Sequence, residues 1–462
     1  MKKIISFLFT TWIVFILLFG LFVKKLEAQH KDISSKKSVT IVDSVDVDFV
    51  TADFPVGFKM ITSGEWQFIA YYNRDRYLSV ASRKLSSKNW EYKILPTRVG
   101  WDSHNYIDMT LDNNNCIHVS GNMHADSMIY FKATRPFDIS SLVKIFPLVN
   151  AEDELKCTYP RFFKSPSNKL VFMYRKGSSG NGNTLFITYD EKIQKFSKLS
   201  DLPLFDGLGQ MSSYMEGPVL GPDGYYHMTW IWRDTPDCET NHDWSYAKSK
   251  DLINWESIAG FKEAMPISPK SLQFTFDPVP VNSGALNGHA HLFFDANKKP
   301  LIAYMKYDKI GNSQIYIATP KEKSWSLYQV STWDYRWNFF GHGTIENQIR
   351  IIKTGFLSNS IIFIRYWHIK KGFGELLIDK NFNTIADRSL TEAESAEFPS
   401  SHLNPFSTNS GIAVKWIKSS VKGNSSEYFG LRWETTGVRR YYDRPSDAIS
   451  PTMMKLYKFV NR

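Results

Sequence analysis

The chain has 462 residues, with 56 lysines and arginines against 46 aspartates and glutamates, so its formal net charge is +10. Three cysteines (Cys116, Cys157 and Cys238) exclude a disulfide framework and leave room for one pair at most. No nucleic-acid-binding module is recognisable.

The first 28 residues have the pattern of a secretory signal peptide. Lys2 and Lys3 precede an apolar run from Ile4 to Val23, and Ala28 offers a small residue for cleavage. Left uncleaved, the run is long enough for an anchor helix. We expect cleavage, a secreted, periplasmic or cell-surface protein, and no stable membrane insertion. The leader contains four lysines and one glutamate, so the mature charge falls to +7 and favours an acidic partner.

Residues 29–40 are a polar spacer, and residues 41–462 form one continuous domain without a Pro/Gly-rich linker. An aromatic content of 15% and many short alternating segments bounded by turn residues indicate an all-β fold. Seven apolar segments recur at intervals of roughly 50–60 residues, the period of propeller blades. They are residues 65–72, 115–122, 169–175, 225–233, 299–307, 360–367 and 411–417. The repeats predict a seven-bladed β-propeller in a single domain.

A second strand follows each apolar segment, and several of these strands end at an aromatic residue. These aromatic residues are Trp90, Phe196, Trp255 and Trp325. An aromatic ring at this place is expected to pack between adjacent blades, so we assign these residues to structure.

Polar side chains recur at two positions of the repeat that open on the same face of a propeller. The ends of strands supply His124, Arg175, Arg233, Lys306 and His368. The starts of the preceding strands supply His104, Tyr159, Tyr214 and His289. Because neighbouring strands are antiparallel, both sets point to one central funnel. Adjacent blades therefore predict one constellation of His104, His124, Tyr159, Arg175, Tyr214 and Arg233.

These residue types favour β-elimination at a uronate over hydrolysis. Histidine and tyrosine can move protons, and arginine can hold a carboxylate or a sulfate. Neutralising the uronate carboxylate acidifies the C5 proton, whose removal expels the oxygen on C4. The reaction requires no cofactor. Asp102, Asp108 and Asp126 are nearby, but their spacing does not give the paired carboxylates of a glycosidase.

Long motifs in the chain resemble the repeat-containing polysaccharide lyases of families 24 and 25, with family 25 favoured. The resemblance is dense between residues 101 and 308, and lies in HVSGNMH, TYPRFF, LVFMYRKGSSGNGN, the long segment from GQMSSYMEG to DWSYAKS, and NSGALN. Members of these families are seven-bladed propellers that cleave ulvan, the sulfated rhamnose–uronate polymer of green algae. The resemblance implies an exported, monomeric lyase that cuts between rhamnose-3-sulfate and glucuronate or iduronate.

The resemblance also implies roles for individual residues. His104 and Tyr159 match the proton-transfer positions, with base and acid left open because the C5 epimer decides between them. His124 and Arg175 match the residues that neutralise the uronate carboxylate. Tyr214 matches a tyrosine that contacts substrate, and Arg233 is placed to hold a sulfate or carboxylate.

A second cluster, Asp234, Cys238 and His242, has donor types that bind Zn²⁺, a thiolate and an imidazole four residues apart. The residues alone fit equally well an unpaired cysteine beside a loop histidine. The resemblance implies a structural Zn²⁺ here, with no part in the chemistry.

Two other functions fit the same repeats. A sialidase-like glycoside hydrolase would need an arginine triad and a Tyr/Glu nucleophile pair, of which the sequence shows only Arg175 and Arg233. A non-catalytic glycan-binding propeller would need a decayed site, whereas His104, His124, Tyr159 and Arg175 are all present.

Overall fold

The computed structural model describes residues 39–53, 55–395, 398, 402, 404–407, 411–421, 424–437 and 449–461. The predicted signal peptide, residues 1–28, and all but two residues of the predicted spacer lie outside this part of the chain. No helix within it is long and apolar enough to cross a membrane. Strands dominate the described residues, with one short helix, α2 (Glu392–Ser395), and 3₁₀ turns at Ile139–Ser141, Cys238–Thr240 and Leu272–Phe274. The all-β prediction is confirmed.

The first half of the chain forms two four-stranded sheets and the beginning of an eleven-stranded one. The first sheet is β2 (Lys59–Ser63), β3 (Trp66–Tyr72), β4 (Tyr77–Lys84) and β5 (Glu91–Arg98). The second is β6 (Asp108–Leu111), β7 (Ile117–Ser120), β9 (Tyr130–Ala133) and β10 (Leu142–Lys144). The third begins with β8 (His124–Asp126), β11 (Cys157–Lys164), β12 (Leu170–Ser178), β13 (Asn181–Asp190) and β14 (Lys195–Lys198).

The eleven-stranded sheet continues, through one parallel bridge from β13 to β15, into a second series of strands. That series is β15 (Ser212–Leu220), β16 (Tyr226–Arg233), β17 (Asn241–Ser249), β18 (Asn254–Glu256), β19 (Lys262–Ala264) and β20 (Thr275–Asp277). Two four-stranded sheets follow, β21 (Ala290–Phe294), β22 (Pro300–Tyr307), β23 (Ser313–Lys321) and β24 (Ser324–Gln329), then β25 (Ile349–Ser358), β26 (Ile361–His368), β27 (Gly372–Asp379) and β28 (Thr384–Ser389).

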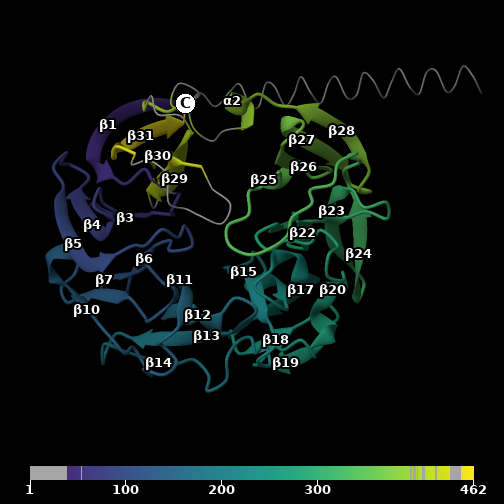
Figure 1. Cartoon of the computed structure of the whole chain (residues 1–462), viewed down its shortest axis with the longest axis horizontal. Helices are drawn as coiled ribbons and strands as arrows, with labels where there is room; N and C mark the ends of the chain where they lie inside the picture. Colours follow the sequence, from purple (N-terminus) through teal and green to yellow (C-terminus); the bar gives the residue numbers. More distant parts are fainter. Residues whose placement is uncertain are drawn as a thin grey trace, which may run out of the picture.

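The last sheet joins the two ends of the described chain. It contains β29 (Ile412–Val421), β30 (Asn424–Thr436), β31 (Thr452–Asn461) and β1 (Val39–Val50), and β1 pairs antiparallel with β31. In Figure 1 the sheets follow one another in sequence order around a ring. Pairing the first strand with the last therefore closes this ring by backbone hydrogen bonds.

Six of the seven apolar segments are the second strands of their sheets or, for β12 and β16, of the two series β11–β14 and β15–β18 in the eleven-stranded sheet: β3, β7, β12, β16, β22 and β26. The seventh overlaps β29, the first strand of the last sheet. A second strand has a sheet partner on each side and neighbouring sheets on both faces. This explains why β16 is buried at every residue and reads as a continuous apolar run instead of an alternating one.

Aromatic rings fill the space between neighbouring sheets, as the sequence predicted for two of the four aromatic residues. Phe196 lies 5.6 Å from Tyr130 of the preceding sheet, and Trp325 lies 5.0 Å from Tyr246. Trp255 is fully buried, whereas Trp90 lies under the Arg83 guanidinium of its own sheet. All three cysteines are buried and unpaired.

His368, at the end of β26, makes stability depend on pH. Its side chain is buried against Trp333 and Tyr335, and its Nδ1 accepts a hydrogen bond from the backbone N–H of Lys370. Burial, and then the charge of Lys371, lowers the pKa of His368 to about 4. The unfolded chain therefore binds a proton that the folded chain excludes. The stabilisation is complete above the unfolded pKa of about 6.5 and is lost as the pH falls below it.

We therefore expect His368 to contribute a loss of about 2 kcal/mol in the free energy of unfolding between pH 7 and pH 5. In the His368→Asn variant the amide oxygen can still accept from Lys370, so the loss over the same range should be smaller by about that amount. Denaturant unfolding at the two pH values measures this difference. An identical pH dependence in both proteins would show that His368 is protonated without unfolding.

Candidate active site

The six residues of the predicted constellation line one cavity of about 740 Å³. They are His104, His124, Tyr159, Arg175, Tyr214 and Arg233. The loop before β6 carries His104, His124 begins β8, and the other four lie on β11, β12, β15 and β16. Residues 286–289, 342–345 and 347, from two other loops, also line the cavity. The sequence repeat thus located these six residues correctly relative to one another.

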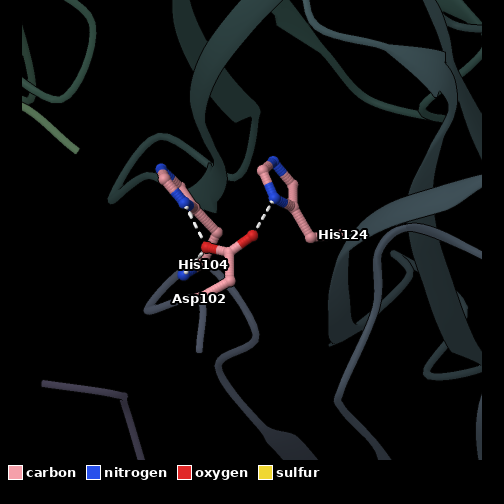
Figure 2. A group of neighbouring side chains, drawn as sticks. All are labelled: Asp102, His104 and His124. Atoms are coloured by element: carbon pink, nitrogen blue, oxygen red, sulfur yellow. Dashed lines mark hydrogen bonds and ion pairs between the residues drawn. The ribbon is translucent and has the colours of Figure 1, made fainter. Parts of the chain in front are cut away.

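Asp102, to which the sequence analysis gave no role, joins the two histidines of the cavity. One carboxylate oxygen lies 2.7 Å from His104 Nδ1 and also accepts from the His104 backbone N–H, at 2.9 Å. The other oxygen bonds His124 Nδ1. The two imidazole rings stack 4.5 Å apart, and in Figure 2 their second nitrogens point away from the carboxylate. One side chain therefore orients both rings.

The charge of Asp102 fixes how the histidines carry their protons. Burial alone would raise the pKa of this carboxyl, but hydrogen bonds from His104 and His124 outweigh burial and hold the pKa well below its usual range. An ionised carboxylate only accepts hydrogen bonds, so each Nδ1 must donate. In a neutral ring the lone pair is then on Nε2, where it can take a proton.

A backbone distortion delivers Tyr159 to the cavity. The pairing of β11 with β12 shifts between Thr158 and Arg161, and Tyr159 lies in this bulge with φ +60°. Left-handed backbone at a tyrosine costs on the order of 1 kcal/mol, and such outliers gather at functional sites. The ring lies parallel to that of Tyr106 at 6.2 Å, and 6.1 Å from the ring of His124. Burial raises the pKa of Tyr159 to about 12, against the opposing effect of Arg175, so its hydroxyl stays protonated.

Arg175 is a buried cation without a counter-ion among the described residues. Its side chain is 3% exposed, and Nε, Nη1 and Nη2 all lack a hydrogen-bond partner of normal geometry. The guanidinium lies over the ring of Tyr159 at 4.8 Å and over that of Tyr214 at 5.5 Å. Leaving a buried charge unpaired is costly. Arg175 is therefore poised to bind an anion that enters the cavity.

The ring of Tyr214 lies close to two guanidiniums, that of Arg175 at 5.5 Å and that of Arg233 at 5.0 Å. Burial raises the pKa of Tyr214, but Arg175 and Arg233 outweigh burial, so the pKa is lower than usual. The hydroxyl of Tyr214 also bonds that of Ser179. The next residue, Gly180, packs against the loop after β16: its φ is +71°, and an added Cβ would lie 2.5 Å from the carbonyl carbon of Thr235.

Arg233 is held by backbone, in contrast to Arg175. Its Nη2 donates to the carbonyl of Pro236 at 2.5 Å, and its Nε donates to that of Asp237 at 3.3 Å. The Arg233 guanidinium therefore stabilises the loop after β16 while one face lines the cavity. Lys306 and His368 occupy the same sequence register but do not line the cavity, because Lys306 pairs with Asp277 at 2.6 Å and His368 packs under Trp333.

The predicted zinc ligands Asp234, Cys238 and His242 are not assembled into a three-ligand group. His242 binds Asp234 at 3.0 Å and Asp243 at 2.9 Å, and these carboxylates raise its pKa against the effect of burial. Cys238 is buried in a separate apolar cluster, and burial raises the pKa of its thiol to about 11. The three residues as placed do not form a three-ligand group, and the structural Zn²⁺ stays a prediction.

Further cavity residues were missed by sequence reasoning because they lie in loops outside the repeat register. Asn287 and Asn347 come from two such loops, and Thr344 Oγ1 lies 3.2 Å from Ser103 Oγ, beside His104. Among the described residues, Asp102, His104 and His124 are the group of three His, Cys, Asp or Glu whose ligand atoms lie within 4.8 Å of one another. The Asp-x-His spacing was the available signal for Asp102.

Comparisons with known proteins place the ring and its cavity in a family. A family described as "BNR repeat-containing family member" matches residues 66–333, more than half of the chain. The chain belongs to this BNR repeat-containing family. No curated protein sequence matches the chain.

Solved structures of two polysaccharide lyases have a similar fold. The lyase Uly1 is 13% identical, with a TM-score of 0.60 over 91% of this chain and 99% of that one. An ulvan lyase of family PL25, bound to -[GlcA(1-4)Rha3S]-, is 12% identical, with a TM-score of 0.53 over 89% of this chain and 95% of that one. The resemblance read from the sequence is therefore confirmed at the level of fold.

Proposed function

We propose that the protein is a polysaccharide lyase that cleaves a sulfated, uronate-containing polysaccharide of the ulvan type by β-elimination. The observation that carries this proposal is the buried Arg175 guanidinium, without a partner and flanked by Tyr159 and Tyr214. A uronate carboxylate is the planar anion that a guanidinium binds through two hydrogen bonds. The similar fold of the ulvan lyases supports the choice of polymer.

In the proposed reaction Arg175 binds the carboxylate on C5 and stabilises the negative charge that develops there as the C5 proton leaves. A base takes that proton, the C4–C5 double bond forms, and the C4–O4 bond breaks. An acid protonates the departing oxygen. His124 lies next to Tyr159 and is held by Asp102 through Nδ1, so it adds a second donor toward the carboxylate only as the imidazolium, through Nε2. The new chain end is a 4,5-unsaturated uronate.

The protonation states favour His104 as the base and Tyr159 as the acid. Asp102 accepts from His104 Nδ1 and leaves Nε2 with a free lone pair in the neutral ring. Tyr159, with its pKa raised to about 12, holds a proton that it can donate. A polymer with the opposite C5 epimer presents its proton on the other face, so the two residues would exchange roles.

The finer architecture belongs to the same proposal. Counting the two series of the eleven-stranded sheet separately gives seven sheets, which we interpret as the seven blades of a propeller. We also propose a signal peptide at residues 1–28, export to the cell surface or beyond, and a monomer that requires no cofactor for its chemistry.

A sialidase-like hydrolase is the second candidate, because Arg161, Arg175 and Arg233 all line the cavity with Glu216. Two of these arginines are engaged by backbone, Arg161 by the carbonyl of Gly217. No hydrogen bond joins Glu216 to Tyr159 or Tyr214 among the described residues, so the Tyr/Glu nucleophile pair of such enzymes is not formed. Glu216 is the single carboxylate among the described lining residues, which also disfavours a two-carboxylate glycosidase.

Incubation with ulvan distinguishes the candidates. Elimination gives rising ultraviolet absorbance from the unsaturated uronate, and this is the expected result. New reducing ends without absorbance would contradict the lyase and favour a hydrolase. Retention on ulvan without cleavage would leave a glycan-binding protein.

Asp102→Asn should lower kcat by about 10- to 100-fold, because the amide cannot accept from both Nδ1 atoms and the rings lose their orientation. Loss of the negative charge should also shift the acidic limb of the pH profile of kcat/KM to lower pH. Asp126→Asn, an exposed carboxylate two residues after His124, is the matched control and should behave as wild type. Equal kinetics and an unshifted profile for the two variants would contradict the role of Asp102.

A further inference from the structure

A second pocket lies away from the candidate active site, on the outer part of the ring. Its volume is about 790 Å³, and it lies between β9–β10 and β13–β14; β10 and β14 are labelled on the outer side of the ring in Figure 1. None of the residues that line the central cavity lines this one. The two sites are therefore separate.

The floor of the outer pocket contains a buried cation, Lys132. This side chain is 4% exposed, and Nζ donates to Gln194 Oε1 at 3.2 Å and to the carbonyl of Ala133 at 3.3 Å. It also lies 5.6 Å from the centre of the Tyr189 ring. No carboxylate of the described residues pairs with Lys132. Because a buried ammonium is costly without an anion, the pocket favours a negatively charged occupant.

One wall of the outer pocket adds positive charge. Lys195 and Lys198 of β14 line it, and Lys198 Nζ forms an ion pair with the Asp153 carboxylate at 3.0 Å. Asp201 is the acidic member of the lining. Three lysines against Asp201 and the paired Asp153 still leave a net positive pocket. Tyr189 adds a buried hydroxyl without a hydrogen-bond partner.

The opposite wall is apolar and is formed by Ile145, Pro147, Leu148 and Val149. A free inorganic anion would contact only the lysines and leave this wall unused. A sugar ring with an apolar face and a sulfate or carboxylate would contact both walls. Ligand pockets usually combine apolar lining residues with a few polar or charged groups in this way. A sulfated deoxy sugar or a uronate has this combination.

We propose that this pocket is a second, non-catalytic binding site for an anionic sugar residue of the polysaccharide. The identity of the polymer rests on the proposed function. A chain that occupies both the outer pocket and the central cavity is held at two points, which raises its apparent affinity without a new catalytic contact. A fragment too short to span both sites would gain nothing from the outer pocket, so the effect is expected for long chains.

The test uses Lys195→Glu, with Lys192→Glu as the matched control. Lys192 is exposed on the same β13–β14 turn but does not line the pocket. Both changes are made in a Tyr159→Phe background, which prevents cleavage, and migration through gels containing ulvan gives the dissociation constant. We expect Lys195→Glu to weaken binding about tenfold relative to Lys192→Glu, the effect of losing one charge-assisted hydrogen bond. In the otherwise wild-type enzyme, both variants should cleave a short oligosaccharide at the wild-type rate.

Equal binding by the two lysine variants would overturn the proposal, because general surface charge would then explain the attraction. Displacement of ulvan by millimolar inorganic sulfate alone would overturn it as well, since the pocket would be an ion site. Lys132→Met, with its melting temperature checked, should reproduce the loss. Specific binding without any cleavage by the wild-type enzyme would refute the proposed function and leave the pocket standing. Cleavage of ulvan by the wild-type enzyme, together with equal binding by the two lysine variants, would refute the outer pocket and leave the proposed function standing.

Discussion

Tyr159→Phe is expected to lower kcat by about 10²- to 10⁴-fold, the range for removing a positioned acid or base. The substitution deletes only the hydroxyl, whose pKa of about 12 keeps it protonated and able to donate to the leaving oxygen. The ring remains and keeps its contacts with Tyr106 and the Arg175 guanidinium. Folding should therefore be unchanged, and the melting temperature checks this.

Tyr106→Phe is the matched control for this experiment, because it removes the same atom from a ring that lines the same cavity. Its turnover should stay within a few-fold of wild type. The measurement is the initial rate of ultraviolet absorbance with ulvan at saturating concentration. Near-wild-type turnover by Tyr159→Phe, or an equal loss in both variants, would remove Tyr159 from the proton-transfer step.

The sequence repeat predicted which residues would lie near one another in the candidate site, because the register of the strands determines where their side chains are placed. A side chain at a given strand end has a fixed place in each sheet, so Arg175 and Tyr214 could be placed together from their register. Lys306 and His368 occupy equivalent places, but Lys306 forms an ion pair with Asp277 and His368 packs against Trp333. The strand register predicts where the backbone places a side chain, but it does not predict which neighbouring residue that side chain contacts.

Features that depend on irregular backbone could not be predicted in this way. Tyr159 enters the cavity through a bulge with φ +60°, which no alternation of apolar and polar residues encodes. Asp102 acts through two hydrogen bonds from a loop, and its role becomes visible only when both histidines are placed. The arrangement of Asp234, Cys238 and His242 is a similar case, because a spacing of four residues does not fix where Cys238 packs.

Arg175 gives the second large effect: Arg175→Ala should lower kcat/KM by about 10²- to 10³-fold, as for loss of a donor to a developing oxyanion. Arg175→Lys should recover only part of the activity, because an ammonium keeps the charge but lacks the planar fork that binds a carboxylate. Added guanidinium ion should partly rescue Arg175→Ala and should not change Arg175→Lys. Failure of rescue together with wild-type kcat/KM in Arg175→Ala would contradict the carboxylate-binding role.

The buried charge of Arg175 should also lower the free energy of unfolding of the protein. All three Arg175 nitrogens are buried without a hydrogen-bond partner of normal geometry, and Tyr159 and Tyr214 are the side chains that face the charge. Arg175→Met keeps most of the apolar stem and removes the unpaired charge. We therefore expect the free energy of unfolding to rise by about 1–3 kcal/mol while activity is lost. Denaturant unfolding measures this change, and a destabilised Arg175→Met would mean that the guanidinium supports the fold instead of waiting for an anion.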